Sequence, residues 1–166
     1  MNVTALSVFK KLPISGVEGG AISADYRIQV VRVQGILTGM RYVEEILQPH
    51  LAPFLQDRGV GLVFMHNNAP PHCAHVARNF LDEANINRLT PWPSHSPDMN
   101  PIEHLRDRLD RHFRALQNPS RTLNELADQL TNAWNATSQE DIRTLVLSMR
   151  RQCAALIDAK GHHTRY

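Results

Sequence analysis

The sequence predicts an α/β domain, and two alternating kinds of pattern support this fold class. Short runs rich in β-branched and apolar residues indicate strands at residues 27–37 and 60–65. Apolar residues that recur every three or four positions indicate helices around residues 38–54 and 71–84. After residue 100 only helical stripes follow, so the C-terminal region is predicted to be helical.

The predicted strands and their connecting helices each have a local reason. "RIQVVRVQGIL" favours a strand with a bulge or turn near Gly35. Thr38 suits the N-cap of the next helix, which Pro49 and Pro53 must kink or divide. "VGLVFM" is typical of a strand covered on both faces, and Pro71 suits the first turn of the helix that follows. "INRLTPWP" predicts one brief strand and then a stop.

The two ends of the chain differ in how clearly they can be interpreted. "VTALSVF" could be a short strand, while "PISGVEGG" is typical of a flexible connection. Apolar stripes predict helices at residues 101–116, 122–136 and 139–159, with Gly161 as a natural C-terminal stop.

Composition restricts the class of protein. The 166 residues suffice for one compact domain, and a formal net charge of +2 excludes a strong attraction to nucleic acid from net charge alone. Cys73 and Cys153 lie too far apart to suggest a disulfide framework, and no apolar run approaches the length of a membrane span. We therefore expect an intracellular protein that does not enter a membrane.

The stretch "GLVFMHNNAPPHCAH" presents polar side chains where a buried strand ends. A two-metal phosphoryl-transfer site needs converging carboxylates, and strand ends and first helical turns are good places to mount them. The candidates are Asn67, Asn68, Asp98 and Glu103. Glu103 also has a purely structural interpretation, because Asn100 as N-cap would place it at the third helical position of a capping box.

Three segments carry a resemblance to the catalytic domain of Tc/mariner-type transposases. They are "FMHNNAPPHCAHVARNFL", "WPSHSPDMNPIEHLRDRL" and "SMRRQCAALIDAKGHHTRY", which are similar to the family's "QDNAxPHxA", "WPxxSPDLNPIEHLWD" and a basic C-terminal tail. "GAISADYRIQVVRVQGILTGMRYVEEIL" resembles the hairpin and helix between the family's first two acids. The resemblance runs from Gly20 to Tyr166, so residues 1–20 form an unmatched segment and residues 21–166 the transposase-derived domain.

The resemblance implies a ribonuclease-H-like fold with three catalytic carboxylates that hold Mg²⁺ or Mn²⁺. The second acid falls on Asn67, where the family has Asp, and the third falls on Glu103, which is retained. The first belongs to an upstream strand that "MNVTALSVFKKLPISG" replaces, and no acid precedes Glu18. We therefore expect a fold truncated at its first strand, without the family's N-terminal helix-turn-helix domains. The family's tryptophan after "EHL" is Arg106 here.

This family origin implies DNA transposition and integration as the ancestral function, in the nucleus. With only Glu103 certain among the acids, we expect Mg²⁺ or Mn²⁺ to bind poorly and the domain to be catalytically inactive. Two alternatives remain. One is a DNA-binding or transposase-associating module, partnered by DNA, by itself or by related transposase chains. The other is a residual nuclease in which Asn68, Asp98 or Glu18 replaces a lost acid.

Two further groups of residues have competing interpretations. The cluster of His66, His72, Cys73 and His75 fits no standard zinc spacing, and His72 more plausibly orders the turn near the site. The arginines form either ordinary helix-surface pairs, such as Arg106 with Asp110, or a phosphate-contacting face that includes Arg106, Arg150 and Arg151.

Overall fold

A four-stranded mixed sheet forms the centre of the domain. The computed structural model describes residues 2–10, 17–58, 62–93, 96, 99–115 and 122–162. Strands β1 (Asn2–Lys10), β2 (Val17–Ile22) and β3 (Arg27–Val33) are antiparallel neighbours, and β4 (Leu62–Met65) runs parallel to β1. The order across the sheet is β3-β2-β1-β4.

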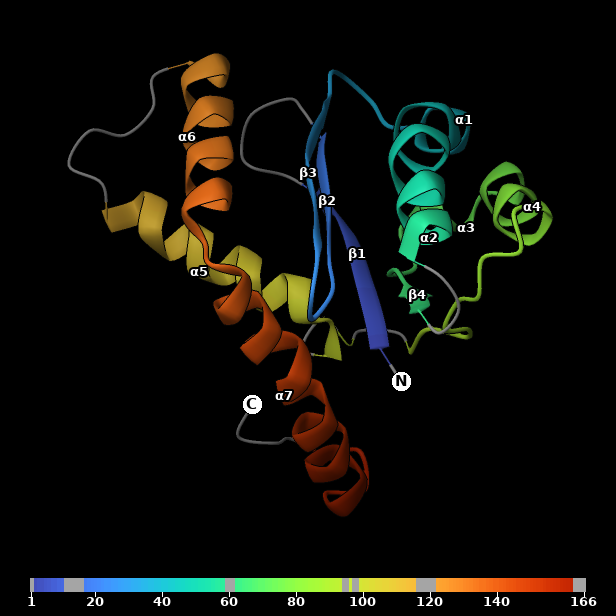
Figure 1. Ribbon diagram of the computed structural model, residues 1–166, viewed down its shortest axis with the longest axis vertical. Coiled ribbons are helices and arrows are strands. Elements are labelled where there is room, and N and C mark those ends of the chain that lie inside the picture. Colours follow the sequence, from blue (N-terminus) through green and yellow to red (C-terminus); the bar gives the residue numbers. More distant parts are fainter. Residues whose placement is uncertain are drawn as a thin grey trace.

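Helices cover both faces of this sheet (Figure 1). On one side lie α1 (Gly39–Tyr42), the π-helix η1 (Val43–Leu51), α2 (Ala52–Arg58), α3 (Pro70–Cys73) and α4 (His75–Glu83). On the other lie α5 (Pro101–Ala115), α6 (Leu123–Ala136) and α7 (Gln139–Asp158), whose C-terminal part projects beyond the sheet. Within the described ranges, none of these helices combines the length and apolarity that a membrane crossing requires.

Successive residues of a strand point to opposite faces, and this divides the core in two. Ile22 and Met65 belong to the cluster beneath α5, α6 and α7, together with Trp134 and Ile142. Their neighbours Ala21 and Phe64 belong to the cluster beneath η1 and α4. β2 and β4 thus contribute buried side chains to both faces of the sheet, as the apolar run "VGLVFM" predicts for β4.

The expectation that the first strand is missing does not hold. Asn2–Lys10 form β1, which pairs with β2 through Ser7 opposite Gly20 and with β4 through Ala5 opposite Met65. The prediction of a flexible connection over "PISGVEGG" is also wrong for the end of that segment, because Val17–Ile22 form β2. Backbone pairing along a central strand outweighs the weak strand pattern of these residues. Whether a domain boundary falls at residue 20 stays a prediction, although β1 and most of β2 precede it.

Most predicted helices are confirmed with local adjustments. Thr38 is the N-cap of α1, since its side chain accepts a hydrogen bond from the Arg41 N–H at 3.3 Å. The helix predicted around residues 38–54 is divided, with Pro49 inside the π-helix η1. The helix predicted at 71–84 is broken at Ala74, whose backbone is extended. The brief strand predicted in "INRLTPWP" is reduced to one parallel bridge between Phe64 and Arg88.

The β2–β3 hairpin is clamped by the junction between α6 and α7. Arg27 donates to the carbonyl oxygens of Trp134 and Thr137 and so caps the end of α6. Gln139 donates to the carbonyls of Ser23 and Ala24, both at 3.1 Å. These bonds satisfy orphan carbonyls at a helix terminus and in a turn, and they fix the hairpin against the helices.

Helix α1 approaches the α3–α4 junction closely because Gly39 has no side chain. A Cβ atom at position 39 would lie 2.3 Å from the Cβ of Ala74 and 3.3 Å from Val76 Cγ1. This contact holds α1 against the segment that follows the end of β4.

Next to that contact lies a group of rings from α1, β4, α3 and the half-buried His66, which follows β4. The His72 ring lies 4.6 Å from Tyr42 and 5.1 Å from His66, and the His66 ring lies 4.9 Å from Phe64, all between centroids. Burial raises the pKa of Tyr42. Burial first, and then the nearby His72 and Arg88, lower the pKa of His66 to about 3. His66 is therefore neutral in the folded protein at pH values where an exposed histidine is charged.

We expect Gly39→Ala to destabilise the domain by about 1–3 kcal/mol or more, because the added methyl group forces α1 away from Ala74. Helix propensity works in the opposite direction, since Ala is the better helix former. Denaturant unfolding of Gly39→Ala, Ala74→Gly and the double variant measures the effect. The second substitution should relieve part of the first, and strictly additive free energies would contradict the contact.

We also expect His66 to make stability fall as the pH is lowered. The unfolded chain binds a proton near pH 6.5 and the folded protein only near pH 3, so the free energy of unfolding falls by up to about 1.4 kcal/mol per pH unit between these values. Urea unfolding of the wild type and of His66→Gln between pH 5 and 7 tests this. Gln does not titrate, so the variant should show the shallower dependence, and identical slopes would disprove the assignment.

Candidate functional site

The end of β4 is shaped by two hydrogen bonds to Asn67. The side-chain Oδ1 of Asn67 accepts from the backbone N–H of Ala69 at 3.2 Å, which forms a tight turn directly after the strand. The backbone carbonyl of Asn67 lies 3.0 Å from His72 Nδ1, which donates to it in the tautomer protonated at Nδ1. His72 thus orders the turn, as expected from its position.

This arrangement limits what the Asn67 amide can offer to a ligand. A backbone N–H can bond only to the amide oxygen, so one lone pair of this neutral oxygen is taken up by the turn, and the other terminal atom is Nδ2, a hydrogen-bond donor. Asp in the same turn would leave a second carboxylate oxygen at that place. The neighbouring amide is also engaged, since Asn68 Nδ2 donates to the Trp92 carbonyl at 2.9 Å.

Glu103 lies in the first turn of α5. Asn100 is almost fully buried and caps this helix, with its Oδ1 accepting from the Ile102 N–H at 3.4 Å, while Pro101 is the first helical residue. The Glu103 carboxylate forms an ion pair with Arg106, one turn further along the helix, at 3.2 Å between Oε2 and Nη1. Spacing also allowed the expected pairing of Arg106 with Asp110, but the described ion pair joins Arg106 to Glu103.

Strand β1 connects the two parts of the candidate site. It pairs with β4 on one side and packs against α5. Ala5 lies opposite Met65, so the same register places Ser7 level with Asn67. An acid mounted on the strand next to β4 would belong at this level, and residues 2–10 contain no Asp or Glu.

The sequence offers two other acids, Glu18 and Asp98, as replacements for a lost catalytic acid. Glu18 belongs to β2, where its backbone lies opposite Phe9 and Arg32, and β1 separates β2 from β4. Asp98 lies outside the described residues. Within the described part of the chain, no three side chains of His, Cys, Asp or Glu converge so as to hold a metal ion.

Among the described residues, the donor set does not fit a pair of divalent cations. Such a pair requires several anionic oxygens, whereas the described side chains offer the carboxylate of Glu103, paired with Arg106, and an amide at position 67. The sequence shows the amide directly, and it places Arg106 within one turn of both Glu103 and Asp110 without selecting between these two partners.

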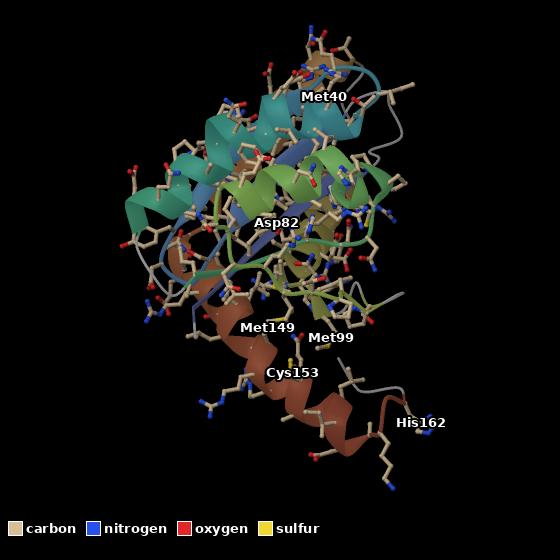
Figure 2. All side chains as sticks on the ribbon, turned by 90° about the vertical axis from the view of Figure 1, so that its right-hand side faces the viewer. Met40, Asp82, Met99, Met149, Cys153 and His162 are labelled. Carbon is tan, nitrogen blue, oxygen red and sulfur yellow. The ribbon has the colours of Figure 1, made fainter. Side chains whose placement is uncertain are left out.

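The arginines considered as DNA contacts occupy different surroundings. Arg106 is 30% exposed in its ion pair with Glu103. Arg150 and Arg151 are exposed on the part of α7 that carries Met149 and Cys153 and ends near His162 (Figure 2).

Comparison with known proteins identifies the family. Residues 20–127 match the family described as DDE superfamily endonuclease. The chain is 38% identical over 136 residues to the Tc1 transposase of Caenorhabditis elegans, which covers 81% of this chain and 48% of that protein. It is 35% identical over 136 residues to the Tcb2 transposase of Caenorhabditis briggsae, with the same two coverages. The chain thus spans about half the length of these curated relatives.

Solved structures confirm the ribonuclease-H-like fold. The catalytic domain of Mos1 mariner transposase superposes with a TM-score of 0.83 at 18% identity, covering 98% of this chain and 84% of that one. The same domain with raltegravir and Mn superposes with a TM-score of 0.81, also at 18% identity, and covers 97% of this chain and 84% of that one. Together with the sequence matches, this places the chain in the DDE superfamily endonucleases, among the Tc1-type transposases.

Proposed function

We propose that this chain is a transposase-derived domain that keeps the ribonuclease-H-like fold but does not cut DNA. One observation carries the proposal. The Asn67 side chain uses one lone pair of its neutral oxygen to close the turn after β4, and its other terminal atom is an N–H donor, so it offers no anionic oxygen where a metal site needs one.

Electrostatics explains why this exchange matters. Two divalent cations about 4 Å apart repel each other by roughly 16 kcal/mol at an effective dielectric constant of about 20, and converging carboxylates must offset this repulsion. Among the described residues one carboxylate, that of Glu103, remains here, and it is paired with Arg106. Structures of the Mos1 catalytic domain contain Mn or Mg. We propose that this chain binds either ion much more weakly than a site with three acids.

A second candidate function is DNA binding without catalysis, and the exposed cations of α5 and α7 favour it. These two helices pack against each other. Their exposed arginines are Arg108, Arg111, Arg114, Arg143, Arg150 and Arg151, of which Arg143 is paired with Asp25, and the exposed Lys160 follows the end of α7. Phosphate contacts from such residues give sequence-independent affinity that falls as salt increases. Exposed acids such as Asp107 interrupt this surface, so the binding is expected to be weak.

Partners and location follow from this proposal. Solved Mos1 assemblies include a paired-end complex with transposon DNA and a strand transfer complex. By analogy, DNA and copies of this chain or of related transposases are the proposed partners, and the nucleus is the proposed location.

We expect no detectable strand cleavage when the chain is incubated with Mg²⁺ or Mn²⁺ and DNA that carries transposon ends. Each 1.36 kcal/mol of lost transition-state stabilisation slows cleavage about tenfold, and the missing carboxylates remove many times that. Denaturing gel electrophoresis of end-labelled DNA is the measurement.

Glu103→Gln is the matched control for this assay. Metal-dependent nicking by the wild type that disappears in Glu103→Gln would show a working site and overturn the proposal. Nicking that survives in Glu103→Gln would indicate a contaminating nuclease.

If α7 contacts DNA, Arg150→Ala combined with Arg151→Ala should weaken binding and reduce its salt dependence. The slope of log K against log salt should become shallower by about 0.9 for each lost phosphate contact. Fluorescence anisotropy with a labelled duplex measures both quantities. Arg143→Ala is the control, because Arg143 lies on the same helix but is paired with Asp25. Equal effects in the two cases would argue against a specific role for residues 150 and 151.

A further inference from the structure

We propose that Arg106 acts as a built-in cation that takes the place of a divalent ion on Glu103 and keeps such ions out of the site. The inference rests on the proposed loss of metal-dependent chemistry and adds a second cause, distinct from the amide at position 67. It assigns to Arg106 a role that the expected surface pair with Asp110 would not give it.

Helix geometry makes this pairing a fixed feature of α5. Glu103 and Arg106 are three residues apart, so their side chains leave the helix on the same face, one turn from each other. The guanidinium Nη1 lies 3.2 Å from the carboxylate Oε2, within hydrogen-bond distance. A metal ion bound to the same carboxylate would lie within a few ångströms of the guanidinium charge.

Burial strengthens the effect. The side chain of Glu103 is 18% exposed and that of Arg106 is 30% exposed, so water screens this pair less than it screens pairs on the open surface. A cation that approaches Glu103 must either displace the guanidinium or accept its repulsion. Both routes weaken metal binding.

The helix itself does not require Arg106 at this position. Asn100 caps α5, and a carboxylate in the first turn is stabilised by the positive end of the helix dipole. The guanidinium therefore changes the charge available to a ligand and is not needed to complete the helix terminus. The resembling family has an uncharged tryptophan here, which leaves the carboxylate of the corresponding Glu without this partner.

Restoring the acid at position 67 should consequently be insufficient by itself. In Asn67→Asp the regained carboxylate is accompanied by a Glu103 that is still paired with Arg106. Removing the guanidinium in that background should remove this positive charge from Glu103 and so favour the binding of a cation.

Isothermal titration calorimetry with Mn²⁺ alone tests the proposal. The proteins are the wild type, Asn67→Asp, and Asn67→Asp combined with Arg106→Gln. We expect the second substitution to tighten Mn²⁺ binding at least about tenfold relative to Asn67→Asp, and Glu103→Gln added to the double variant to abolish the gain. The Mn²⁺-dependent rise in melting temperature should follow the same order.

Arg114→Gln in the Asn67→Asp background is the matched control, because it removes the same charge from an exposed position on the same helix. A gain no larger than that of Arg114→Gln, or no Mn²⁺ binding in any variant, would overturn the proposal. If circular dichroism shows that Arg106→Gln does not fold, Arg106→Trp replaces it with the residue usual in the family. Cleavage by the wild type would refute the proposed function instead, so the two failures are distinguishable.

Discussion

The hydrogen bond from the Ala69 N–H to the side-chain oxygen of Asn67 sets the geometry of the whole site. It ends β4, directs the chain into α3 and brings His72 to the carbonyl of Asn67. Asp and Asn both supply the single acceptor that this turn needs, so the backbone is insensitive to which of them is present. The fold therefore places no constraint on the charge at position 67, whereas metal chemistry depends on it entirely.

The elements that could be predicted from sequence are those specified by neighbouring residues. Apolar spacing gave α5, α6 and α7, and the run before His66 gave β4. The π-helix could not be predicted, because Pro49 indicates that the helix is irregular but does not indicate which kind of irregularity forms. That form depends on Leu47 and Leu51 being held in the core against the sheet. The break at Ala74 likewise follows from the close approach of Gly39, which lies far away in sequence.

The first strand and the surroundings of Glu103 depend on non-local contacts. The suggestion that "VTALSVF" could be a short strand is confirmed by β1, but its central place in the sheet comes from pairing with β2 and β4 on both sides. Asn67 and Glu103 could be identified as candidate positions because each stands at a recognisable strand or helix end. The ion-pair partner of Arg106 could not be identified from the sequence, because Glu103 and Asp110 both lie within about one turn of it. Only the folded structure selects Glu103.

An amide in place of a carboxylate at position 67 has a consequence for stability. Carboxylates gathered for metal binding repel one another when no cation is bound, so a catalytic centre of this kind lowers the stability of the empty fold. An amide at position 67 and an internal ion pair at Glu103 relieve this repulsion without any metal. The packing of the buried Trp134 against Gly20 and the clamp on the β2–β3 hairpin involve neither of these two residues. These contacts are therefore independent of the charge at positions 67 and 103.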